Sequence, residues 1–115
     1  MKRLTWLGDS RASLRAFPPP VQDGIGYSLY RAQLGETPTS AKPLRGLGPG
    51  VMEIVSNDPS GTYRAVYTVS IGDSIYVVHA FQKKSKAGIA TPRAEIELVR
   101  RRIKQLRSEV RNAEE

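Results

Sequence analysis

The 115-residue sequence contains no cysteine and only one histidine. The lack of cysteine excludes disulfide scaffolds, thiolate nucleophiles and thiolate metal ligands. One histidine is too few for a histidine-rich metal site. No apolar run approaches the ~20 residues that a membrane span needs. The charge at Asp9 comes before the apolar region of a signal peptide could form. We therefore expect a soluble intracellular protein with no cofactor, no metal and no membrane contact.

The composition favours a folded domain that binds a partner of opposite charge. Hydrophobic residues make up 39% of the chain and charged residues 25%, so the chain can bury a core. The length suits one domain over residues 1–115. Lysine and arginine number 18 against 11 acidic residues, a formal net charge of +7. A domain this basic usually binds a polyanion or an acidic protein.

Glycine and proline divide the first half of the chain into a strand, two helices and a loop. A short strand is expected over 3–7. Asp9 or Ser10 can cap a helix to about Phe17 by accepting a backbone N–H. The prolines at 18–20 end this helix and begin another over about 21–34. The apolar face of that helix comprises Val21, Ile25, Leu29 and Ala32. Residues 36–50 have the composition of a loop.

Three strands are expected in the second half, over 51–56, 62–70 and 74–82. Short turns between runs rich in β-branched and aromatic residues predict antiparallel hairpins. Alternation divides the third strand into two largely apolar faces, so we expect it to be interior and covered on both sides. On this alternation His79 shares a face with Val77 and Phe81.

The last helix is predicted from Thr91 as N-cap and Pro92 as first helical residue. Apolar residues then recur at spacings of three and four, at Ile96, Val99, Ile103, Leu106 and Val110. This stripe either packs on the sheet, which we favour, or gives up its place there to a helix of a partner protein in a complex. The predicted order is βααβββα, a small α+β domain with a mostly antiparallel sheet and helices packed on it.

The basic residues are concentrated at the end of the chain. Ten of the 18 lie between Lys83 and Arg111. Three of these, Lys83, Lys84 and Lys86, follow directly on the third of the expected strands. A run of charge by itself usually marks a solvated surface. Arg64, however, lies within a strand, where it faces solvent or a bound anion.

Four blocks of sequence resemble the Gp49-like, HigB-type branch of the RelE/ParE toxin superfamily. They are AKPLRGLGPGVMEIV (41–55), TYRAVYTV (62–69), YVVHAFQKK (76–84) and the arginine-rich helix opened by Thr91-Pro92. They occur in the family's order, and the resemblance covers about residues 3–111. It implies a RelE-like fold with the same βααβββα order.

The resemblance implies the toxin of a type II toxin–antitoxin module, a bacterial cytoplasmic, ribosome-dependent endoribonuclease that cuts mRNA and thereby blocks translation. The implied partners are a cognate antitoxin, of a HigA-like helix-turn-helix kind, mRNA and the ribosome, with operator DNA reached only through the antitoxin. The implied reaction is metal-independent transesterification, in which the ribose 2′-OH attacks the adjacent phosphorus. Such a site needs cations around the phosphate and groups that move protons.

On this resemblance, Arg64, Lys83 and Lys84 are placed around the scissile phosphate. The RNA backbone and ribosomal RNA are assigned to Lys42, Arg45, Lys86, Arg100 and Arg101. His79 is the candidate general acid or base, since its ordinary pKa lies near neutrality. The alternative, which we favour for a lone strand histidine, is a hydrogen-bonded core residue. Glu53 is a possible base, although a cross-strand ion pair with Arg64 is preferred.

Two other functions remain open. A ParE-like toxin that inhibits DNA gyrase would use the same fold, because one scaffold can host both activities. The sequence that ends the third strand, His79 to Lys84, favours the ribonuclease branch. A basic module that binds RNA or the ribosome without catalysis is the third possibility.

Overall fold

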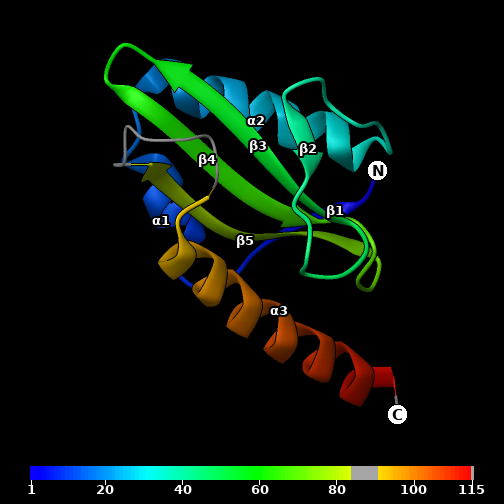
Figure 1. Cartoon of the computed structure of the whole chain (residues 1–115). Helices are drawn as coiled ribbons and strands as arrows, with labels where there is room; N and C mark the ends of the chain where they lie inside the picture. The colour runs from blue at the N-terminus through cyan, green and yellow to red at the C-terminus, as the bar shows by residue number, and fades with distance from the viewer. Residues whose placement is uncertain (84–90, 115) are drawn as a thin grey trace.

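The computed structural model describes residues 1–83 and 91–114. Its elements run in the order β1 (Arg3–Trp6), α1 (Ser10–Arg15), α2 (Pro19–Gln33), β2 (Ala41–Pro43), β3 (Val51–Asp58), β4 (Gly61–Thr68), β5 (Ser74–Lys83) and α3 (Arg93–Glu114). The strands form one sheet in the order β1-β5-β4-β3-β2, with β1 parallel to β5 and the other neighbours antiparallel (Figure 1). The predicted α+β fold is confirmed, and β5 is an interior strand as expected.

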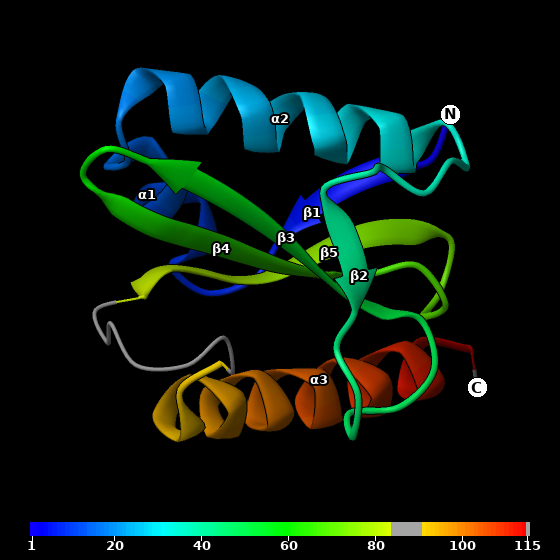
Figure 2. The same ribbon diagram turned by 45° about the horizontal axis from the view of Figure 1, so that its top comes forward.

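The helices cover both faces of the sheet, with α1 and α2 on one side and α3 on the other (Figure 2). The predicted apolar face of α2 is buried against the sheet, from Val21 to Ala32. On the opposite side, the stripe of α3 packs on Val51, Val66, Val78 and Phe81. The prediction that this stripe packs on the sheet is therefore confirmed. No helix among the described residues is both long and apolar enough to cross a membrane.

The edge strand β2 was not predicted, because its sequence Ala-Lys-Pro lies within a segment of loop composition. It pairs with β3, and Lys42 lies opposite Glu53. The predicted side-chain cap of α1 is also wrong. Asp9 is the N-cap residue but makes no capping hydrogen bond. The Ser10 hydroxyl instead donates to the carbonyl of Val77 at 3.0 Å, which ties α1 to β5.

A β-bulge in β5 overturns the predicted division of that strand into two faces. Val66 of β4 pairs with His79, and the next residue, Tyr67, pairs with Val77, so Val78 is the extra residue. Val77 packs on the α2 side, whereas Val78 and Phe81 pack on the α3 side. His79 therefore faces α3 rather than sharing a face with Val77. A bulge changes the direction of the side chains that follow it. Because β5 is apolar on both faces, its sequence contains no sign of the extra residue.

Candidate functional site

A group of polar and charged side chains is buried where the α3 side of the sheet meets the beginning of α3. Glu53, Arg64, His79 and Lys83 come from β3, β4 and β5, and each is less than a tenth exposed. Thr91 and Glu95 cover them from the start of α3. Buried charges are retained only when they are paired or hydrogen-bonded. We call Glu53, Arg64, His79, Lys83, Thr91 and Glu95 the polar cluster.

Glu53 and Arg64 form an ion pair across adjacent strands. The Arg64 Nη1 donates to the Glu53 Oε1 at 2.9 Å, and both side chains are almost fully buried. The hydroxyl of Thr91 joins them: it accepts from Arg64 at 3.2 Å and donates to the Glu53 Oε2 at 2.6 Å. The preferred reading of Glu53 as a partner of Arg64 is confirmed. The predicted helix start at Pro92 is one residue early, since α3 begins at Arg93, and the Thr91 hydroxyl instead links the segment before α3 to two strands.

His79 is held through both ring nitrogens by groups of α3. Its Nε2 shares a short contact with the Glu95 carboxylate, and its Nδ1 lies 3.5 Å from the Arg102 Nη1. The ring also stacks on Phe81, with 5.1 Å between centroids. His79 is thus the hydrogen-bonded, buried histidine that we favoured. Glu95 is about a third exposed, so it is the part of this pair that a solute can reach.

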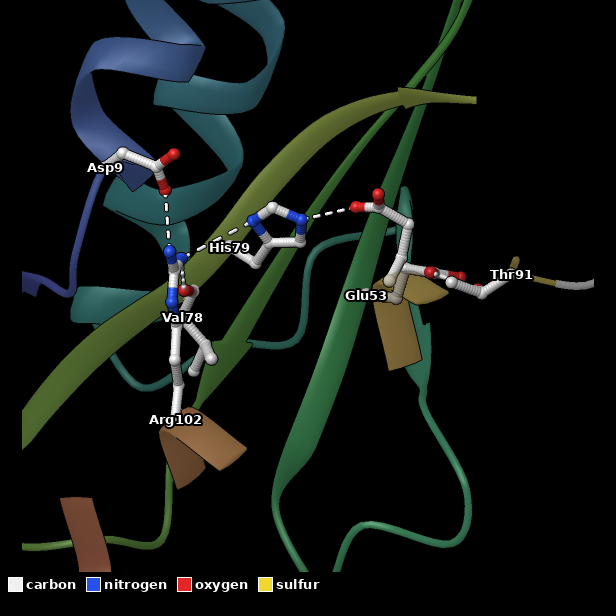
Figure 3. Close-up of polar contacts among 7 residues, drawn as sticks. Asp9, Glu53, Val78, His79, Thr91 and Arg102 are labelled. Carbon is white, nitrogen blue, oxygen red and sulfur yellow. Dashed lines mark hydrogen bonds and ion pairs between the residues drawn. The ribbon is translucent and has the colours of Figure 1, made fainter. Parts of the chain in front are cut away.

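Arg102 extends the contacts of His79 to the first loop of the chain. Its Nη1 donates to the Val78 carbonyl at 2.9 Å, and its Nη2 donates to the Asp9 carboxylate at 2.8 Å. Figure 3 shows the line from Asp9 through Arg102 to His79, with Glu53 and Thr91 beyond the imidazole. The hydrogen bond from Arg102 holds the pKa of Asp9 below its ordinary value. Arg102 therefore links the middle of α3 to the β5 bulge and to the loop before α1.

The predicted cations lie in three places. Arg64 and Lys83 are on the α3 side of neighbouring strands, with Thr62 the residue that pairs with Lys83. Lys42 and Arg45 are exposed on β2 and the loop after it. Arg100 and Arg101 are exposed on α3. Lys84 and Lys86 lie outside the described residues.

Sequence reasoning did not single out Thr91, Glu95, Arg102 or Asp9 as site residues. The sequence presents Thr91 as a helix-start signal and Arg102 as one arginine in an arginine-rich helix. Asp9 and Arg102 are separated by 93 residues, and no local pattern connects them. The one available signal was that Thr91 lies just before, and Glu95 on, the first turn of an amphipathic helix that packs on the sheet.

The polar cluster contains chemical groups of the kinds that phosphoryl transfer uses. Arg64 and Lys83 supply positive charge, and an imidazole beside a carboxylate can accept or donate a proton. The described residues hold no group of three or more His, Asp or Glu side chains that could bind a metal ion.

The family model of the phage-derived protein Gp49-like matches residues 12–104. The chain belongs to the Gp49-like family. The match spans α1 to the middle of α3 and includes all six residues of the polar cluster. This confirms the Gp49-like part of the predicted resemblance. A search of curated protein sequences finds no match to this Gp49-like chain.

Among solved structures, the Gp49-like chain is similar to the isolated RelE toxin of Escherichia coli. The TM-score is 0.56 at 20% identity, over 88% of this chain and 98% of that one. It is also similar to a chain of the toxin–antitoxin complex RelBE2 from Mycobacterium tuberculosis. There the TM-score is 0.51 at 18% identity, over 71% of this chain and 98% of the other. At such identities the likeness establishes the fold, which is that of RelE.

Proposed function

We propose that this Gp49-like protein is the toxin of a type II toxin–antitoxin module, of the HigB type, and that it cleaves mRNA on the ribosome. The polar cluster is the observation that carries the proposal. It gathers two cations and a histidine–carboxylate pair on one side of neighbouring strands of a RelE-like sheet. The family membership and the fold support the same reading. The protein would act in the bacterial cytoplasm and be held inactive by a HigA-like antitoxin.

In the proposed reaction the ribose 2′-oxygen attacks the adjacent phosphorus and the 5′-oxygen leaves, so a 2′,3′-cyclic phosphate forms. The Glu95–His79 pair would take the proton of the 2′-OH, because Glu95 is its exposed member, and would return it to the 5′-oxygen as the bond from phosphorus to that oxygen breaks. Arg64, Lys83 and Lys84 would stabilise the negative charge that develops on the phosphate, with a forked contact from arginine and point charges from lysine. No metal ion is required for these steps.

Burial limits how substrate reaches this site. Arg64 and His79 are covered by Thr91, Glu95 and Arg102. RNA would therefore meet Glu95 first, and full access to Arg64 would require the start of α3 to shift. A purely structural ion-pair network would be equally buried. A measurement of RNA cleavage therefore distinguishes a catalytic site from a structural one.

The test is induced expression in bacteria, with mRNA 5′ ends mapped against an uninduced control. New ends at in-frame codon positions on translated messages are expected. Lys83→Ala with Lys84→Ala should abolish them, since each lost electrostatic contact lowers the rate by about 10²–10³-fold. Arg11→Ala with Arg15→Ala, on the exposed side of α1, removes the same charge and should leave cleavage intact.

Each other outcome contradicts the proposal in a distinct way. Growth arrest with unchanged mRNA and a DNA-damage response would indicate gyrase inhibition. Unchanged mRNA and normal growth would leave the non-catalytic binding module. A folded Lys83/Lys84 double variant that still cuts would refute the site assignment, and circular dichroism shows whether it is folded.

A further inference from the structure

A second cationic site lies along α3 from Arg100 to Arg111, beyond its N-terminal turn. A groove of about 380 Å³ separates the helix from the loop that follows β2. Four basic residues line it, Arg100, Lys104, Arg107 and Arg111, and none of its eight described lining residues carries a carboxylate. Figure 2 shows the loop running beside α3 at this position. We call these four residues and the loop opposite them the basic groove.

The four cations form one line along the helix. They are spaced four, three and four residues apart, so consecutive charges rise by about 4.5–6 Å along the axis. Like charges at these spacings repel one another and weaken a helix by about 0.2–0.5 kcal/mol per pair. Of the four, Arg100 has a carboxylate neighbour, Glu97 at 3.8 Å on the exposed surface.

The loop orients two of these arginines. Arg100 donates to the Gly46 carbonyl at 3.3 Å, and Arg107 donates to the Leu47 carbonyl at 3.4 Å. Each guanidinium carries five N–H donors, so one carbonyl contact uses a small part of its capacity. A solvated helix face would have no such contacts. The arginines are therefore arranged before any ligand arrives, which lowers the entropy cost of binding.

Gly48 makes room for this arrangement. Its φ of +100° favours glycine, and a Cβ there would lie within 2.9 Å of Arg107 Nη1 and 3.0 Å of its Cζ. A larger residue would push the guanidinium out of the groove. The glycine-rich loop and the arginine thus fit each other, although they are far apart in the sequence.

We propose that the basic groove binds the phosphodiester backbone of RNA, at a site separate from the polar cluster. A nucleic acid strand carries its charges in a regular line, which a line of cations on one helix can follow. Three of the four cations are arginine, whose planar fork matches a phosphate. The choice of RNA rests on the proposed function. The groove would hold the nucleic acid while the polar cluster performs the chemistry.

The experiment measures binding of a fluorescein-labelled, single-stranded 20-nucleotide RNA to the full chain by fluorescence anisotropy, at several salt concentrations. Lys104→Gln with Arg111→Gln removes two exposed cations of the groove. The slope of log K against log salt is negative, and each lost phosphate contact reduces its magnitude by about 0.7. The magnitude of the slope should therefore be smaller by about 1.4 in the double variant. Extrapolated from 1 M salt, where the screened contacts contribute nothing, the same two contacts predict binding about 25-fold weaker at 0.1 M salt.

The matched control is Arg11→Gln with Arg15→Gln, which removes the same charge from α1. That helix packs through Leu14 on the opposite face of the sheet. The control should bind RNA nearly as the unaltered protein does. Gly48→Ala is a third variant with unchanged charge, and it should weaken binding by displacing Arg107. Thermal melting establishes that each variant is folded.

Four results would overturn the inference. Equal losses in the groove and control variants would mean that net charge alone attracts RNA. Absence of RNA binding by the unaltered protein would exclude the site. Groove-dependent binding of poly-glutamate but not of RNA would indicate an acidic protein partner. Cleavage that persists in folded groove variants with unchanged RNA affinity would sink this inference and leave the proposed function standing. RNA binding that depends on the groove, with no cleavage, would support this inference and contradict the proposed function.

Discussion

The buried pair of Glu53 and Arg64 gives the sharpest prediction about stability. Replacing Glu53 with leucine would leave the Arg64 guanidinium buried without its carboxylate, which lies 2.9 Å away in the folded protein. Removing one partner of such a pair costs about 3–5 kcal/mol. Domains of this size have unfolding free energies of about 5–15 kcal/mol, so the loss is a large fraction of the total.

Urea denaturation measures this loss. With an m value of about 2 kcal/mol/M, the midpoint should fall by about 2 M. Arg64→Leu in the Glu53→Leu background should recover most of the stability, because a buried pair replaced by apolar residues is often neutral or better. Thr91→Val removes the hydroxyl that donates to Glu53 and should cost about 1–3 kcal/mol, since it leaves buried polar groups without this partner.

The matched control is Glu36→Leu. Glu36 pairs with Arg31 at 2.6 Å, a shorter contact than the buried pair, but both side chains are more than 40% exposed. Solvent screens such a pair, so its loss should move the midpoint little. If Glu53→Leu and Glu36→Leu shifted the midpoint equally, the reasoning from burial would be wrong.

Three further predictions concern pH and the backbone. Burial raises the pKa of Tyr67 to about 12, from an ordinary value of 10.0. The folded state keeps this proton longer than the unfolded state, so stability should fall by about 2–3 kcal/mol between pH 10 and 12. Urea midpoints across that range should decline less for Tyr67→Phe, and an identical decline would contradict the assignment. Because Arg102 lowers the pKa of Asp9, their contact stabilises the fold above the ordinary pKa near 3.8 and loses its effect as pH falls through the folded value. Thermal melting between pH 2 and 6 should show a shallower acid decline for Asp9→Asn, and parallel curves would count against it. Gly50 has a φ of +74°, and a Cβ there would lie 3.1 Å from the Ser70 backbone nitrogen. Gly50→Ala should therefore destabilise by about 1–3 kcal/mol in urea titrations, and an unchanged midpoint would refute the steric argument.

The sequence predicted the elements whose signals are periodic and long. The stripe from Ile96 to Val110 located α3 and the face that it buries, and the spacing from Val21 to Ala32 did the same for α2. The three-residue strand β2 had no such period and was missed. The bulge at Val78 was missed because apolar residues occupy both sides of β5. One extra residue there changes which helix His79 faces.

Among the residues of the polar cluster, the sequence singled out those on the strands and missed their partners near the start of α3. Arg64 and His79 drew attention because a charge and an imidazole are unusual inside apolar strands. Their partners on α3 did not, since Thr91 and Glu95 have ordinary reasons to begin a helix. Which carboxylate meets His79 depends on how α3 lies across the sheet, and this is a property of packing rather than of local sequence.

The parallel pairing of β1 with β5 has a consequence for how the chain folds. Arg3 pairs with Ser74, and Asp9 reaches Arg102, so contacts that complete the sheet and fasten α3 join the two ends of the chain. Such long-range closure carries an entropy cost that local hairpins avoid, and it slows folding. During synthesis the hairpin of β3 and β4 can form early, whereas β1 must wait until β5 has been made. A newly made chain therefore acquires its polar cluster only after Thr91 and Glu95 have been made.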